Sequence, residues 1–149
     1  MKIFIIGSKH NYHRVEEIKK QLEMKGHIIT LPVGFDDPSL EFKLNVENPE
    51  ELLKIKNETL IKQRKCVLEN DAVFVMNFEK RGQPNYIGGA TFLEMYEAFI
   101  NKKKIYLYNP IPEGILNASS IITLALFLPI PGKPNQIIHI IRDNIVIII

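Results

Sequence analysis

The sequence has no tryptophan and only one cysteine, Cys66, among its 149 residues. A single cysteine cannot form an internal disulfide bond, so the sequence lacks the signature of a disulfide-stabilised secreted protein. The chain starts Met-Lys and passes directly into a short apolar run, without the long apolar segment of a secretory signal. We therefore expect a cytoplasmic protein in which Cys66 is a packed residue rather than a nucleophile.

The sequence also has little net charge. Its 19 basic and 17 acidic residues give a formal net charge of +2, which is too small to indicate a nucleic-acid or membrane partner. The apolar segment Leu124–Ile130 is too short and too near proline to span a bilayer. Hydrophobic and charged contents of 46% and 24% are ordinary for a globular chain, and the length predicts one domain with a sizeable core.

What the sequence does contain is an alternation of short apolar runs with amphipathic stretches. Strands are predicted at 2–6, 27–31, 72–77 and 104–108, and helices from residue 15 to the stop at Gly26, at 49–69 and at 91–100. The strand–helix–strand opening predicts two parallel strands with a right-handed crossover. The sequence therefore predicts an α/β fold, a flavodoxin- or Rossmann-like three-layer sandwich with a parallel sheet of four to five strands.

The C-terminal tail, residues 113–149, is atypical and is assigned to the same domain as 1–112. It is strongly apolar from Ile121 onward, with three prolines between Leu128 and Asn135. Residues 142–144 separate two isoleucine-rich runs and are a candidate hairpin turn. Such a hairpin would present an aggregation-prone edge unless it packs on the domain or on a partner subunit.

The first candidate site is the stretch Gly88-Gly89-Ala90-Thr91-Phe92-Leu93-Glu94, which follows a predicted buried strand. Two glycines let the backbone turn tightly and approach a ligand, and ligands of open α/β sheets bind beyond the ends of the strands. Glu94 is then a candidate nucleophile for attack on a sugar carbon. The alternative is a capping box, in which Glu94 with Thr91 caps its own helix. Glu97, one turn further, ranks below Glu94.

The second candidate site is the basic segment 7–14 between the first strand and its helix. Backbone N–H groups, the Ser8 hydroxyl and a helix N-terminus form an anion site. Positive charge from Lys9, His10, His13 and Arg14 predicts a phosphorylated ligand with its phosphate near Ser8. The alternative is a solvated basic turn. No acidic or cysteine companion accompanies the two histidines, so no metal is expected.

Other candidates are more isolated. Asp36 and Asp37 follow the second strand, where acids bind ribose hydroxyls or assist a leaving base, although they are also common turn formers. Asn77 ends the third strand and is a candidate for binding a sugar or orienting Glu94, and Tyr86 for stacking on a base. The predicted ligand-binding residues are Gly7, Ser8, Tyr12, Asn77, Tyr86, Gly88 and Gly89.

Two segments carry a resemblance to a known family. The first is Asn70-Asp71-Ala72-Val73-Phe74-Val75-Met76-Asn77, and the second is Gly89-Ala90-Thr91-Phe92-Leu93-Glu94-Met95-Tyr96-Glu97-Ala98 followed by Lys103-Lys104-Ile105. With the opening Lys2-Ile3-Phe4-Ile5-Ile6-Gly7-Ser8, they make residues 1–112 resemble the nucleoside 2-deoxyribosyltransferase-like superfamily. Within it, the stretch Asn85-Tyr86-Ile87-Gly88-Gly89-Ala90-Thr91-Phe92-Leu93-Glu94 is similar to a subgroup of uncharacterised microbial proteins.

The resemblance implies cleavage or exchange of the N-glycosidic bond of a nucleoside or nucleoside monophosphate. It places Glu94 as the nucleophile, implies no cofactor, and implies a homo-oligomer. The Thr91-x-x-Glu94 spacing is also similar to that of phosphoribohydrolases that release cytokinin-type bases. The family's aspartate before the Gly-Thr turn is replaced by Ile87-Gly88, so a non-catalytic nucleotide-binding module is the alternative. A structural protein whose apolar tail seals an oligomer is the third.

Overall fold

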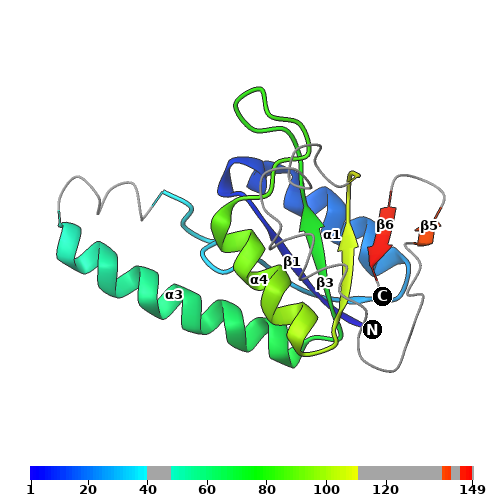
Figure 1. The fold of residues 1–149 in the computed structure, drawn as a ribbon, viewed down its shortest axis with the longest axis horizontal. Coiled ribbons are helices and arrows are strands. Elements are labelled where there is room, and N and C mark those ends of the chain that lie inside the picture. Colours follow the sequence, from blue (N-terminus) through cyan, green and yellow to red (C-terminus); the bar gives the residue numbers. More distant parts are fainter. Residues whose placement is uncertain (40–47, 111–138, 142–144, 149) are drawn as a thin grey trace.

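The structure is a computed structural model that describes residues 1–39, 48–110, 139–141 and 145–148 (Figure 1). The strands are β1 (Lys2–Gly7), β2 (Ile28–Thr30), β3 (Ala72–Met76), β4 (Lys104–Leu107), β5 (His139–Ile141) and β6 (Ile145–Ile148). The helices are the 3-10 helix η1 (Lys9–Arg14), α1 (Val15–Met24), α3 (Pro49–Glu69) and α4 (Gly89–Ile100). Among these residues, no helix is long and apolar enough to cross a bilayer.

One sheet organises the molecule, with the strand order β2-β1-β3-β4-β6-β5. The first four strands are parallel to one another, which confirms the predicted α/β, Rossmann-like class and the expected parallel pairing of the first two strands. β6 pairs antiparallel with β4, and β5 pairs antiparallel with β6. The turn predicted at 142–144 lies outside the described residues.

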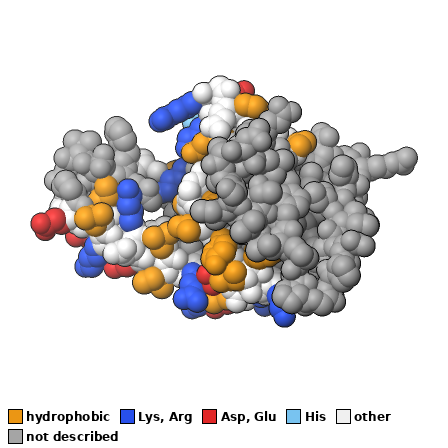
Figure 2. Space-filling model, in the orientation of Figure 1, with side chains coloured by type: hydrophobic (Ala, Val, Ile, Leu, Met, Phe, Trp, Pro, Cys, Tyr) orange, Lys and Arg blue, Asp and Glu red, His pale blue; other side chains and the backbone are white. Residues whose placement is uncertain are grey.

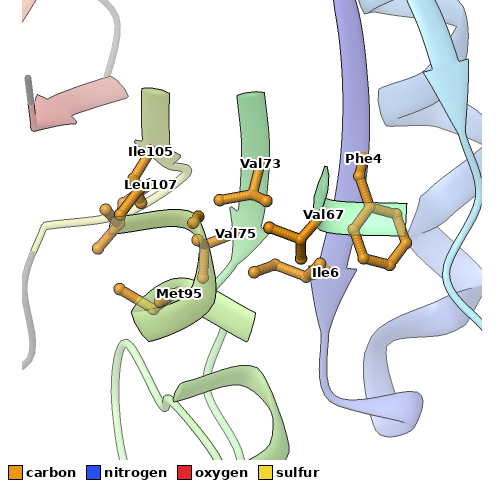
Figure 3. Close-up of a cluster of buried hydrophobic side chains, with 9 residues drawn as sticks. Phe4, Ile6, Val67, Val73, Val75, Met95, Ile105 and Leu107 are labelled. Atoms are coloured by element: carbon orange, nitrogen blue, oxygen red, sulfur yellow. The ribbon is translucent and has the colours of Figure 1, made fainter. Parts of the chain in front are cut away.

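The central strands are apolar throughout because helices cover both faces of the sheet. In β1, Ile3 and Ile5 point to one face and Phe4 and Ile6 to the other, and all four are buried. The first pair packs with α1, and the second packs with α3 and α4 in the cluster drawn in Figure 3. The predicted three layers are present: α1 lies on one side of the sheet, and α3 and α4 lie on the other (Figure 1).

Local capping explains where the helices begin. α3 has the predicted bounds because Pro49 occupies its first position and the Asn48 side chain accepts a hydrogen bond from the Glu51 backbone at 3.1 Å. α4 begins at Gly89, two residues before the predicted start at Thr91, and Gly88 is its N-cap.

The carboxyl ends of β1 and β3 are adjacent and in close contact. A Cβ at Gly7 would lie 3.0 Å from the Cβ of Met76, and Gly7 has φ +156°, so this position requires glycine. From this edge the chain leaves β1 towards α1 on one face, and it leaves β3 towards α4 on the other face. Diverging connections of this kind open a crevice, the usual ligand position in open α/β sheets.

Candidate active site

A cavity of about 510 Å³ lies at the carboxyl ends of β1 and β3. Its walls come from the end of β1, from η1, from the middle of α3, from the loop after β3 and from the first turns of α4. Of the residues predicted from the sequence, it is lined by Gly7, Ser8, Tyr12, Tyr86, Gly88, Gly89 and Glu94. Segments distant in the sequence therefore meet here, and the volume lies within the range of about 300–1,000 Å³ typical of small-molecule sites.

Glu94 lies in the second turn of α4 and lines the cavity, yet only 6% of its surface is exposed. The capping-box alternative is wrong, because Gly88 is the N-cap and no side chain caps this helix. Within the described part of the chain, the carboxyl group has no hydrogen-bond or ion-pair partner. Burial raises its pKa from 4.5 to about 8, so the group is mostly protonated at pH 7.

Gly88 and Gly89 do not act as expected, since the sequence predicted that both allow a tight turn of the backbone. Gly88 has φ −81°, so the turn itself does not require glycine. A Cβ there would instead lie 3.2 Å from the Tyr86 ring. A Cβ at Gly89 would meet no atom within 4 Å, and Gly89 lines the cavity. Gly88 thus makes room for Tyr86, and Gly89 leaves the start of α4 open to a ligand.

The basic segment is divided by the fold. Lys9 and His10 line the cavity with Ser8, whose hydroxyl makes no cap hydrogen bond to η1. The Arg14 guanidinium lies 3.9 Å from the ring centre of Phe78, on the α1 side of the sheet, and Arg14 is not a lining residue. His13 is exposed and does not line the cavity either. Only the first half of the predicted anion site therefore reaches the cavity.

The wall formed by α3 was not predicted. Lys56, Thr59 and Gln63 recur at spacings of three and four, so they share one face of the helix, and all three line the cavity. The Gln63 Oε1 atom is buried and has no hydrogen-bond partner among the described residues. The spacing of these polar residues was visible in the sequence, but nothing in the sequence showed that they line the cavity.

The loop after β3 supplies a further cation. Lys80 lines the cavity, and its ammonium group lies 4.9 Å from the ring centre of Tyr86. With Lys9 and Lys56, it gives the cavity three lysines from three separate segments. Such a lining suits a ligand that combines an anionic group with polar and aromatic parts.

Three predicted site residues lie elsewhere. Asp37 accepts hydrogen bonds from the backbone and hydroxyl of Ser39, as a turn former does, and neither it nor the exposed Asp36 is a lining residue. Asn77 is fully buried, and its side chain bonds the backbone of Asn109 through both its oxygen and its nitrogen. These bonds tie the end of β3 to the end of β4, so Asn77 has a structural role.

Two other titratable residues, Cys66 and Glu97, are not candidate nucleophiles. Cys66 packs against the α3–α4 core cluster, and burial, with lesser contributions from Glu69 and Glu94, raises the pKa of its thiol. It is therefore a poor nucleophile. Glu97 forms a 3.0 Å ion pair with Arg64. Within the described ranges, no cluster of three or more histidine, cysteine or acidic side chains is arranged to hold a metal ion.

Comparison with known proteins adds no further guide to this cavity: no family model matches the chain, and neither a curated protein nor a solved structure matches it.

Proposed function

We propose that the cavity binds a nucleoside or nucleoside monophosphate and that Glu94 cleaves or exchanges its N-glycosidic bond. The observation that carries the proposal is the Glu94 carboxyl, which lines a 510 Å³ cavity although it is buried and has no partner among the described residues. Burying a carboxyl without a partner costs free energy, and such a cost is characteristic of functional sites.

The reaction has two steps. The ionised Glu94 oxygen bonds to the anomeric carbon of the sugar, and the carbon–nitrogen bond breaks with its electron pair going to the base, which takes a proton from water. Water or a second base then attacks the same carbon, releases the Glu94 carboxylate and loses a proton. Water as acceptor makes the protein a hydrolase, and a base makes it a transferase.

Other lining residues have roles consistent with this ligand. Ser8, Lys9 and His10 are suited to a 5′-phosphate, which tilts the proposal towards nucleotides. Tyr86 offers a ring for stacking on the base. The open space at Gly89 lets the sugar approach the first turns of α4, where Glu94 lies.

The test is a time course of free-base release from deoxynucleoside monophosphates by the wild type and by Glu94→Ala. We expect turnover by the wild type and a loss of at least about a thousandfold in the variant, because the nucleophile is removed. Glu97→Gln is the matched control on the same helix and is expected to retain activity. Equal inertness of wild type and Glu94→Ala would reject the proposal.

The pH dependence gives a second readout of the same assignment. Because the nucleophile must be ionised and burial raises the pKa of Glu94 to about 8, kcat/KM is expected to rise with pH up to about pH 8. A mass spectrum of protein quenched during turnover is expected to show a sugar adduct on the peptide that contains Glu94.

The alternative is a non-catalytic nucleotide-binding module. Two observations favour it: burial keeps Glu94 mostly protonated at pH 7, and neither Asp36 nor Asp37 lines the cavity to assist a leaving base. A neutral carboxyl contacts ribose hydroxyls without reacting. Tight reversible binding of a nucleoside monophosphate by calorimetry, with no base released and no adduct formed, would establish this alternative.

A further inference from the structure

The side chain of Gln63 carries an unpaired hydrogen-bond acceptor at the cavity wall. Gln63 lies on α3 and lines the cavity, and its Oε1 atom is buried without a hydrogen-bond partner among the described residues. Asn11 Nδ2 and His27 Nδ1 are also buried and unpaired in the described part of the chain, but their residues do not line the cavity. A buried acceptor without a donor destabilises the protein, so Gln63 is suited to a donor that a ligand supplies.

The packing of α3 against α4 sets the position of Gln63 along the cavity. Arg64 forms a 3.0 Å ion pair with Glu97, and the Lys103 ammonium reaches the Leu68 carbonyl at 2.8 Å. The second contact lies further along both helices than the first, so α3 and α4 run in the same direction, as Figure 1 shows. Residues of the two helices can therefore be compared in height from the ion pair.

Gln63 lies close to the level of Glu94. Gln63 directly precedes Arg64, and Glu94 lies one turn before Glu97. Measured along the helices, the two residues are thus within about one turn of each other. Since both line the same cavity, the amide and the proposed nucleophile face the same part of a bound ligand.

The lysines of α3 and of the loop after β3 lie away from this pair. Lys56 precedes Gln63 by seven residues, which is about 10 Å along the helix axis. Lys80 belongs to the loop that leads into the start of α4, before Glu94. Figure 2 shows basic side chains over that loop and between it and α3, on the face in view. A phosphate held by these lysines leaves the sugar for the part of the cavity beside Glu94 and Gln63.

The chemistry of the sugar identifies the missing donor. In the proposed reaction a Glu94 oxygen attacks the anomeric carbon, which must lie within about 3–3.5 Å of it. That carbon is bonded to the base nitrogen, to the ring oxygen and to C2′, and neither the nitrogen nor the ring oxygen carries a hydrogen. The nearest donor of the ligand is therefore a hydroxyl group on C2′. The other donors of a nucleotide lie farther along the sugar or the base.

We propose that the cavity selects ribose over deoxyribose because Gln63 Oε1 accepts a hydrogen bond from the 2′-hydroxyl of a ribonucleotide. The inference rests on the function proposed above and names the sugar that it left open. A deoxy analogue lacks this hydroxyl and leaves the acceptor buried and unpaired, so it binds more weakly. Gln63 is thus a specificity-determining residue and takes no part in bond breaking.

Titration calorimetry with matched nucleotides tests the contact without turnover. The monophosphates of adenosine, guanosine, cytidine and uridine and their 2′-deoxy forms are titrated into Glu94→Gln, which cannot form a sugar adduct, and into the double variant with Gln63→Met. In Glu94→Gln, the tightest ribonucleotide is expected to bind at least about tenfold more tightly than its deoxy form. In the double variant this ratio is expected to fall close to one, because methionine is unbranched like glutamine but has no amide oxygen.

The matched control is Lys62→Met in the same Glu94→Gln background. Lys62 is the exposed neighbour of Gln63 on α3 and does not line the cavity, so this variant is expected to keep the ratio. Circular dichroism verifies that each variant is folded. Equal affinities for both sugars in Glu94→Gln, or a ratio that Gln63→Met leaves unchanged, would overturn the inference and leave the proposed function in place. Binding of none of the nucleotides would reject the proposed function, and the inference with it.

Base release gives a second readout with Glu94 intact. Gln63→Met is expected to lower kcat/KM for the ribonucleotide by at least about tenfold and to change kcat/KM for the deoxynucleotide by less than about twofold. An equal loss with both nucleotides would show that the amide acts on the base or on Glu94 instead of the 2′-hydroxyl, and it would overturn the inference.

Discussion

Burial of Glu94 destabilises the folded state at neutral pH. The folded-state pKa of about 8 lies above the ordinary value of 4.5, so between these values the native chain binds a proton that the unfolded chain has released. Stability therefore falls as pH rises from about 4.5 to about 8, by about 1.4 kcal/mol per pH unit at most. The burial that holds the Glu94 carboxyl beside the cavity thus lowers the free energy of unfolding at neutral pH.

Glu94→Gln removes the ionisation and keeps the shape of the side chain. We expect the variant to be more stable than the wild type by on the order of 3 kcal/mol at pH 7, and the difference to vanish near pH 4.5. Urea unfolding of both proteins at pH 5, 7 and 8 measures the two curves. A difference that stays constant across these pH values would show that Glu94 ionises normally in the folded chain.

The residues with predicted chemistry could be located only in part from the sequence. Glu94 lines the cavity, and its place in the helix that follows β3 could be predicted because the order of strand, loop and helix is encoded locally. Asn77 directly follows β3 and was therefore a candidate for the site. Its side chain instead bonds the backbone of Asn109, which is 32 residues away in the sequence. Asp37 is engaged by Ser39 within its own turn. The partner of Asp37 lies two residues away, whereas the partner of Asn77 is a distant residue that the sequence does not identify.

At the scale of the element, α4 ends in a Schellman motif whose left-handed position is occupied by Lys102 instead of glycine. The Lys103 N–H bonds the Ala98 carbonyl at 2.9 Å, and the Lys102 N–H bonds the Phe99 carbonyl at 3.0 Å. Lys102 therefore adopts φ +56°, in the left-handed region that glycine occupies without strain. The Lys103 ammonium then reaches the Leu68 carbonyl at 2.8 Å, at the end of α3.

Lys102→Gly is expected to stabilise the protein by about 1 kcal/mol, because it relieves the left-handed strain while keeping both backbone hydrogen bonds. Lys102→Ala is the control, since alanine retains the strain, and it is expected to match the wild type. Thermal unfolding at equal protein concentration compares the three chains. Equal midpoints for all three would contradict a strained cap.

Helix boundaries could be predicted wherever a cap is encoded locally. The bounds of α3 were predicted correctly because Asn48 and Pro49 define its start. The start of α4 was displaced by two residues because Thr91, a common cap residue, lies in the first turn instead. The sequence does not show which face of α3 packs towards the sheet. The positions of Lys56, Thr59 and Gln63 in the cavity wall were therefore not predicted.

At the scale of the whole molecule, the tail strand β6 covers an edge of the parallel sheet. Ile105, Tyr106 and Leu107 of β4 are in register with residues 148, 147 and 146. Without β6, the outer N–H and C=O groups of β4 would be unpaired, and an exposed apolar edge strand recruits other chains. The tail therefore contributes to the fold through backbone pairing.

Deleting residues 139–149 is expected to lower the urea midpoint and to cause light scattering that grows with protein concentration, because β4 becomes an open edge. Static light scattering and urea unfolding of the full-length and shortened chains measure both effects. A shortened chain with an unchanged midpoint and no scattering would show that β4 tolerates an open edge.

The sequence by itself determined the alternation of strands and helices, the parallel order of the first strands and the position of Glu94 just beyond β3. These features follow from periodicity, glycine and proline, which act over a few residues. Only the tertiary structure decided which polar groups share the cavity. It turned Arg14 towards Phe78, kept Asp36 and Asp37 outside, and brought α3 to the wall, because contacts between distant segments depend on how whole elements pack.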